Sequence, residues 1–172
     1  MIRWATPLLF VALWLAYVVG TMRTPALRHG AELDWGVLSG GLDSIEAWRR
    51  AIVDGDILRL FSALFLHADW IHLLGNLVFL LIFGLPAERV MGGGRILALF
   101  LLGGAVANLA AVLAIGAPDR VIIGASGAVS AVIGAYLALF PGARLGVVLP
   151  LGIFLQFVRV PASLLIGLWA LL

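Results

Sequence analysis

The sequence has no cysteine and no lysine, and charged residues make up only 12% of its 172 positions. The absence of cysteine excludes disulfides, thiolate metal sites and cysteine catalysis. The basic residues are eleven arginines scattered along the chain, and the formal net charge is only +2. A nucleic-acid partner is therefore not expected, because no phosphate-binding face is formed.

Apolar residues are unusually frequent in the sequence, whereas charged residues are few. Apolar residues make up 63% of the chain, and the mean hydropathy is +1.16, whereas soluble domains are about 45–50% apolar. A water-soluble globule cannot bury this much apolar surface, so the composition excludes a soluble enzyme and predicts an integral membrane protein.

The apolar residues are gathered in runs, and a spanning helix needs about 20 of them. The runs predict four spans and the start of a fifth: 4–20, 70–90, 96–115, 122–140 and 161–172. A cleaved signal peptide is the alternative for the first run, whose apolar core is short. The stretch 145–158 is interrupted by Pro150 and Gln156, which predicts a hairpin or a re-entrant segment.

We expect one membrane domain over residues 1–172. Its parts are a first span (1–21), an outer loop (22–60), core spans two to four (61–140), and a hairpin with the start of a fifth span (141–172). The outer loop is polar and contains Trp35 and Trp48, so it reads as a folded or interfacial loop. A tight glycine-rich turn is expected at 91–95.

Charge placement predicts the orientation of these spans. The N-terminus and the loops on its side of the membrane contain five arginines and one acid, Glu88. The loops on the other side contain six arginines and eight acids. The positive-inside rule then places the N-terminus in the cytoplasm and residues 22–60 outside.

Two polar residues of the second span lie on one helix face, because His72 and Asn76 are four positions apart. Polar groups at membrane depth indicate function, although hydrogen bonding between helices explains this pair equally well. No metal site is expected from His67, Asp69 and His72, which do not share a helical face and lack a further strong ligand elsewhere.

The fourth span begins with Gly124-Ala125-Ser126-Gly127. A serine just inside a helix N-terminus lies beside free backbone N–H groups, which can stabilise an oxyanion. The alternative is a close-packed helix crossing, because small residues recur at every fourth position after Ser126.

In order and spacing, these residues resemble the rhomboid intramembrane serine proteases. The matching residues are Arg59, His67, His72 and Asn76 (R-x7-H-x4-H-x3-N), then Phe83-Gly84, Glu88, Gly92 and Gly124-x-Ser126-Gly127. The resemblance covers about residues 58–140 and implies an all-α polytopic helical bundle with six spans, five of which begin in this chain. Leu58 stands where a tryptophan commonly precedes the arginine.

The resemblance also implies roles for the matching residues. Ser126, between Gly124 and Gly127, would be the nucleophile, and its N–H would form an oxyanion hole with His72 and Asn76. Arg59 and Glu88 would fix the first loop and the inner end of the second helix, while His67 would shape a water-filled entrance.

The implied reaction is hydrolysis of peptide bonds in or near transmembrane helices of membrane proteins, with no cofactor. The expected partners are a transmembrane substrate and membrane lipid. The expected location is a bacterial inner membrane, with the active site opening outward.

One departure from the family is serious. A serine nucleophile needs a general base, which in rhomboids is a histidine of the sixth span. Here the histidines are His29, His67 and His72, and none follows Ser126. Residues 161–172 form about 18 Å of helix, short of the roughly 30 Å bilayer core, so we expect the rest of the fifth span and a sixth span beyond residue 172.

Two competing interpretations remain. A catalytically inactive rhomboid-like protein would bind membrane clients without cutting them, although retention of Ser126, His72 and Asn76 argues against it. A transporter fragment would show paired half-helices or charges at mid-span, and the sequence has neither.

Overall fold

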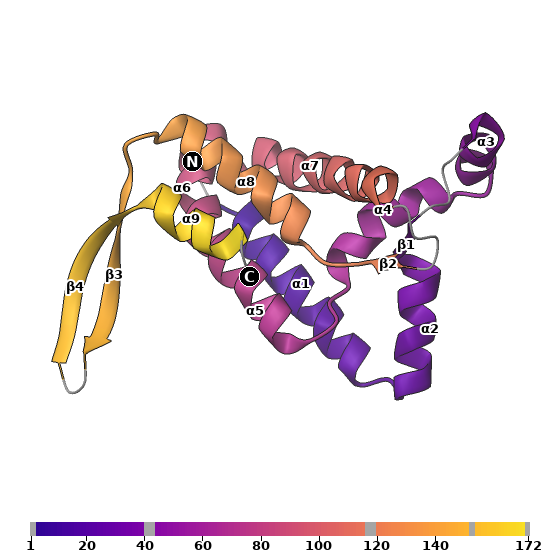
Figure 1. The fold of residues 1–172 in the computed structure, drawn as a ribbon, viewed down its shortest axis with the longest axis horizontal. Coiled ribbons are helices and arrows are strands. Elements are labelled where there is room, and N and C mark those ends of the chain that lie inside the picture. Colours follow the sequence, from indigo (N-terminus) through magenta and orange to yellow (C-terminus); the bar gives the residue numbers. More distant parts are fainter. Residues whose placement is uncertain (1–2, 40–43, 116–119, 152–153, 171–172) are drawn as a thin grey trace.

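The structure is a computed structural model that describes residues 3–39, 44–115, 120–151 and 154–170. Its core is a bundle of four helical segments (Figure 1): α1 (Ala5–Thr21), α5 (Trp70–Phe79), α7 (Gly93–Ala114) and α8 (Ser126–Leu139). Within it, α1 and α8 each pack against both α5 and α7. The all-α bundle expected from the sequence is confirmed, with two small two-stranded sheets added to it.

The outer loop is folded, as predicted. It contains α2 (Pro25–Trp35), β1 (Val37–Leu38), α3 (Ile45–Val53) and the 3-10 turn η1 (Asp56–Leu58). Thr24 and Ser44 cap α2 and α3, because their hydroxyls accept the N–H of Leu27 and Ala47. Figure 1 shows α2 and α3 at one end of the bundle.

The second predicted span is one continuous helical stretch from Trp70 to Met91. It consists of α5, a π-helical segment η3 (Leu80–Gly84) and α6 (Leu85–Met91). The chain reaches it through α4 (Arg59–Ser62) and the 3-10 turn η2 (Ala63–Phe65).

Two predicted boundaries were wrong. The turn expected at 91–95 is reduced to Gly92, whose φ of +84° reverses the chain so that α7 already begins at Gly93. The fourth helix begins at Ser126 instead of residue 122, because β2 (Val121–Ile122) pairs antiparallel with β1.

The segment after α8 contains the expected hairpin, and a helix follows it. Strands β3 (Arg144–Leu151) and β4 (Phe154–Pro161) pair antiparallel, and α9 (Ala162–Ala170) follows. In Figure 1 the hairpin projects from the end of the bundle opposite α2 and α3.

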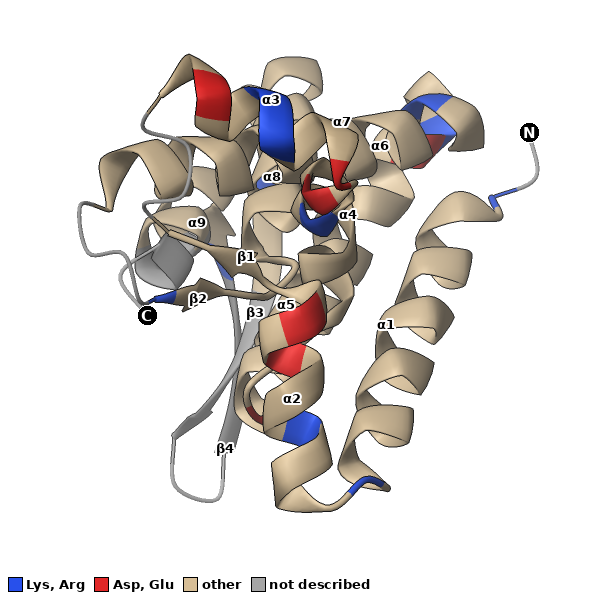
Figure 2. Cartoon of the chain, turned by 90° about the vertical axis from the view of Figure 1, so that its right-hand side faces the viewer, with Lys and Arg blue, Asp and Glu red and all other residues tan. Residues whose placement is uncertain are grey.

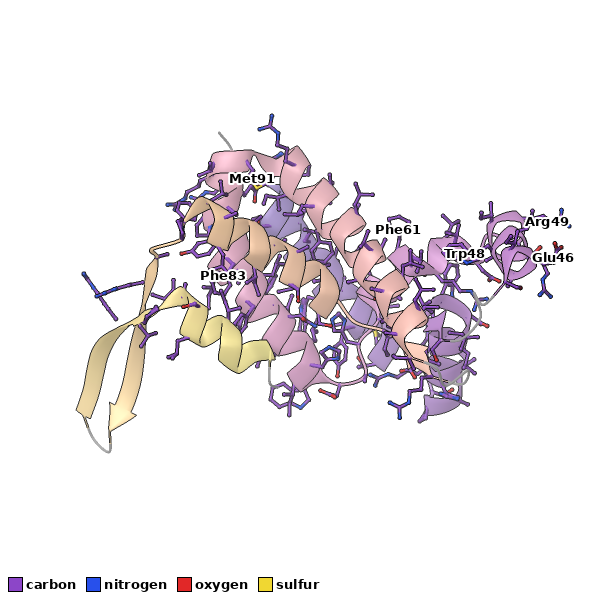
Figure 3. The ribbon with its side chains drawn as sticks, turned by 45° about the horizontal axis from the view of Figure 1, so that its top comes forward. Glu46, Trp48, Arg49, Phe61, Phe83 and Met91 are labelled. Atoms are coloured by element: carbon purple, nitrogen blue, oxygen red, sulfur yellow. The ribbon has the colours of Figure 1, made fainter. Side chains whose placement is uncertain are left out.

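The core of the bundle is apolar and closely packed. Phe83, labelled in Figure 3, is fully buried, as are Leu13 on α1 and Phe100 on α7. Since α1 contributes Leu13 to this core, the first apolar run packs against the other helices of the bundle.

Small residues bring α7 and α8 together. A Cβ atom at Gly103 would lie 2.4 Å from that of Ala131, and one at Gly127 would lie 2.5 Å from that of Ala107. The close helix crossing that was the alternative explanation of the glycine–serine motif is therefore also present, and Gly127 is part of it.

Charged residues are unevenly distributed over the helices. Figure 2 shows α1 without a charged residue, whereas α2 and α3 carry several. Two helical stretches are long and apolar enough to cross a membrane, namely Trp70–Met91 and Gly93–Ala114, and shorter apolar helices are formed by Ala5–Thr21 and Ser126–Leu139.

Candidate active site

The turn that leads into α8 lies directly against the start of α5. Gly124 has a φ of +117°, and its N–H donates to the carbonyl of Ala63 at 2.9 Å. A Cβ atom on Gly124 would lie 2.6 Å from Cε1 of His72. Only glycine therefore allows the His72 ring to pack on this turn, two residues before Ser126.

His67 joins this turn to α5. Its Nε2 accepts the N–H of Ala125 at 3.3 Å and lies 3.1 Å from Nδ2 of Asn76. Because an N–H group points at Nε2, this nitrogen carries the lone pair, and the hydrogen-bond network assigns the ring proton to Nδ1. The rings of His67 and His72 meet edge to face, with centroids 5.2 Å apart.

His67 is only 4% exposed, yet it lines a pocket between α1 and α2. Its role at a water-filled entrance stays a prediction. Burial, with a further contribution from nearby His72, lowers the pKa of His67 to about 4. The imidazole is therefore neutral at pH 7, which preserves its acceptor nitrogen for Ala125.

Asn76 is buried, with 1% exposure. One N–H of its amide can donate to His67, and a side-chain amide has two such donors. The second donor is left for a group bound beside the turn.

Ser126 is the first residue of α8, so it lies at the helix N-terminus as predicted, although the helix begins four residues later than expected. No hydrogen bond engages the backbone N–H of Ser126 or Gly127 within the described part of the chain. Such free N–H groups at a helix start, together with the Asn76 amide, are donors that can polarise a carbonyl and stabilise the negative charge of a tetrahedral intermediate.

Arg59 and Glu88 lie away from this turn and hold other parts of the chain. The Arg59 guanidinium donates to the carbonyl of Leu33 at 3.0 Å and pairs with Asp56 at 2.9 Å, which ties α2 to the start of α4. The buried carboxylate of Glu88 accepts three consecutive N–H groups at the start of α1, from Trp4, Ala5 and Thr6.

Sequence reasoning missed two supporting residues. Asp69 caps α5, because its Oδ1 accepts the N–H of His72 at 2.8 Å, and an aspartate before an apolar run is a usual helix-start signal. Arg28 donates from Nη2 to the carbonyls of His67 and Ala68. No local pattern could indicate that contact, which joins residues about 40 positions apart.

The described contacts thus bring His67, His72 and Asn76 together with the turn before Ser126. Arg59 and Glu88 lie apart from this cluster, where each connects two helices through hydrogen bonds. The cluster is built from α5, the link before it and the N-terminus of α8.

Comparison with known proteins identifies the family. The model of the Rhomboid domain matches residues 54–172. Curated relatives include RHOMBOID-like protein 5 of Arabidopsis thaliana, which is 36% identical over 90 residues (52% of this chain and 29% of the relative). The putative rhomboid protease YdcA of Bacillus subtilis is 31% identical over 96 residues (55% and 47%).

Rhomboid-related protein 2 of Mus musculus is 33% identical over 109 residues, or 60% of this chain and 32% of the relative. The chain thus spans less than half the length of each of these relatives, and no solved structure matches it. The family model covers well over half of the chain, and the apolar helices agree with it, so this integral membrane protein belongs to the rhomboid family.

Proposed function

We propose that the protein is an intramembrane serine endopeptidase that hydrolyses peptide bonds in or near the transmembrane helices of other membrane proteins. The observation that supports this proposal is the close packing of His72 on Gly124, which brings the polar face of α5 to the turn before Ser126. A bundle that needed only a helix crossing would not require a polar cluster there.

In the proposed reaction, the Oγ of Ser126 attacks the carbonyl carbon of the scissile peptide. The carbonyl oxygen becomes an oxyanion, which the Ser126 N–H, Asn76 and His72 stabilise. The C–N bond then breaks, the amine product takes up a proton, and water releases the acyl group from Ser126. Donors placed in advance toward the developing charge give most of the acceleration in such sites.

A general base must accept the Ser126 proton. The acceptor nitrogen of His67 is occupied by Ala125 and Asn76, and His72 has the oxyanion role. Neither histidine is therefore assigned as the base, so the proposed reaction needs a further group that accepts the Ser126 proton.

We further propose a location in a bacterial inner membrane, with the N-terminus in the cytoplasm and the active site opening outward. The arginine distribution supports this orientation. The outer loop, with α2 and α3, then lies on the side from which water reaches Ser126.

The test uses the full-length protein, reconstituted with a single-span model substrate. Ser126→Ala should abolish cleavage, whereas Ser130→Ala, one turn further along α8, should leave it nearly unchanged. Asn76→Ala should lower kcat by about 10- to 1000-fold, the usual worth of one oxyanion-hole donor.

Two outcomes would contradict the proposal. Wild-type protein that retains the substrate but never cleaves it would identify an inactive rhomboid-like protein that binds membrane clients. Unaltered cleavage by Asn76→Ala would show that Asn76 has no oxyanion role.

A further inference from the structure

The link between η2 and α5, residues 66–69, determines where two site residues lie. His67 is inside the link, and Asp69 at its end caps the turn of α5 that carries His72. A change in the peptide planes of this link would therefore move the His67 ring and the start of α5 together.

Few backbone contacts hold this link. The N–H of Leu66 donates to Ala63 at 3.3 Å, and the carbonyl of Asp69 accepts from Leu73 at 3.2 Å. Between these two bonds, the carbonyls of His67 and Ala68 both accept from Nη2 of Arg28. Hydrogen bonds from a charged donor are stronger than those between neutral groups.

Arg28 is itself held in position on several sides. Its guanidinium carbon lies 5.6 Å from the centre of the Tyr17 ring on α1, and its Nε lies 3.7 Å from the Glu32 carboxylate one turn further along α2. These contacts limit where Nη2 can point, so the guanidinium is a fixed support and not a mobile surface charge.

We propose that Arg28 is a positioning residue of the active site: by holding the carbonyls of His67 and Ala68, it sets where the His67 ring and the first turn of α5 meet the turn before Ser126. The proposal rests on the function proposed above. It connects α2 in the outer loop to the donors that act on the oxyanion, through the bonds of His67 to Asn76 and Ala125.

Arg23 provides a matched control. It lines the same pocket of about 160 Å³ between α1, α2 and residues 65–67. Its side chain makes no hydrogen bond or ion pair within the described residues. Arg23→Gln therefore removes the same charge from the same pocket without releasing the link.

The first experiment measures cleavage of a single-span model substrate by the full-length protein in liposomes. Arg28→Gln should lower kcat about tenfold and change KM less than twofold, because a misplaced donor affects the transition state more than substrate binding. Arg28→Lys should recover at least a third of the wild-type kcat, since an ammonium can still donate to both carbonyls. Arg23→Gln should keep wild-type values.

A second experiment measures the pKa of His67, which depends on the burial of its ring and does not require catalysis. Full-length protein labelled with ¹⁵N-histidine is titrated by NMR, and the His67 signal is assigned by its loss in His67→Gln. The groups around this ring are His72, Asp69 and Arg28, with Glu32 behind Arg28. Arg28→Gln should raise the His67 pKa toward its ordinary value, because a displaced ring is less buried, whereas Arg23→Gln should not.

The two experiments separate the two proposals. If wild-type protein does not cleave, the proposed function fails, and the titration alone decides the role of Arg28. An unchanged His67 titration in Arg28→Gln would overturn the positioning role. So would a loss of kcat that Arg23→Gln shares, or a rise in KM at constant kcat.

Discussion

Gly124 combines two constraints in one residue. Its φ of +117° is a conformation that L side chains rarely adopt, and its α-carbon faces the His72 ring. Backbone strain of this kind costs about 1–3 kcal/mol when a side chain is forced into it. The packing of His72 on the turn is therefore possible only because this position has no Cβ.

Gly124→Ala should accordingly destabilise the protein by about 1–3 kcal/mol and reduce cleavage, because His72 must move away. Gly134→Ala, within α8, is the control, since a Cβ there meets no neighbouring residue within 4 Å. Alanine favours a helix over glycine, so this control should be neutral or stabilising by up to about 1 kcal/mol. Thermal unfolding in detergent measures the stability of both variants. Equal changes in stability would contradict the prediction.

His67 should make stability depend on pH. Its pKa is about 4 in the folded protein and 6.5 as the ordinary value, so the unfolded chain binds the proton more readily. The contribution of His67 is complete above pH 6.5 and decreases as the pH falls toward 4, by about 3 kcal/mol at most.

Melting curves of wild type and His67→Gln between pH 7.5 and 4 test this effect. The difference in stability between the two proteins should shrink as the pH falls, because the contribution of His67 is lost. Other titrating groups, including His72 and Asp69, are present in both proteins and do not change this difference. A difference that stays constant over this range would contradict the assignment.

The spacing of residues predicted which side chains matter but not which atoms they contact. His72 and Asn76 share a face by helical geometry alone, and Ser126 begins a helix as expected. The contact of His67 with the Ala125 N–H follows from the packing of the link 66–69, which Arg28 holds from a distant helix. Such a contact has no local sequence signal.

At the level of elements, long apolar runs predicted the helices well and short glycine-rich segments predicted them poorly. Gly93 and Gly94 read as a loop, yet they join α7 because Gly92 alone makes the turn. Ile122 read as the start of a helix, yet it belongs to β2 because it pairs with Val37, 85 residues earlier. Local composition cannot show a pairing over that distance.

Glu88 connects two elements, because its carboxylate on α6 caps the first turn of α1. Glu88→Gln replaces an acceptor-only group with an amide whose N–H groups face other N–H groups. A buried unsatisfied donor costs about 1–3 kcal/mol, so the variant should lose about 2–3 kcal/mol of stability in thermal unfolding.

Glu46→Gln is the corresponding control. Glu46 lies on the exposed helix α3, where it pairs with Arg49 at 3.2 Å (Figure 3). Exposed pairs contribute about 0–1 kcal/mol. If both variants melt at the same temperature, the capping of α1 by Glu88 contributes little.

For the whole molecule, composition predicted the class of protein and the motif predicted the family. The proposed orientation remains to be tested, as does the division of residues 1–172 into one domain with the boundaries given above. Asp119, which the orientation places outside, falls in 116–119 and thus beyond the described residues.

Single cysteines test the orientation directly, since residues 1–172 have none of their own. In a full-length protein otherwise free of cysteine, Glu46→Cys should react with an impermeant thiol reagent in intact cells. Arg95→Cys and Arg144→Cys should react only after the membrane is opened. Labelling of Arg95→Cys in intact cells would reverse the proposed orientation.

The π-helical segment η3 has a consequence for rotation about the helix axis. Asn76 and Glu88 are 12 positions apart, which in a plain α-helix, at about 100° per residue, would turn them about 120° away from each other. The wider π turn takes up one extra residue. This reduces the angle between the two side chains by about 100°, so both point in nearly the same direction. Both are in fact 1% exposed. Shortening η3 by one residue would therefore let the helix direct either Asn76 toward the turn before Ser126 or Glu88 toward the start of α1, but not both.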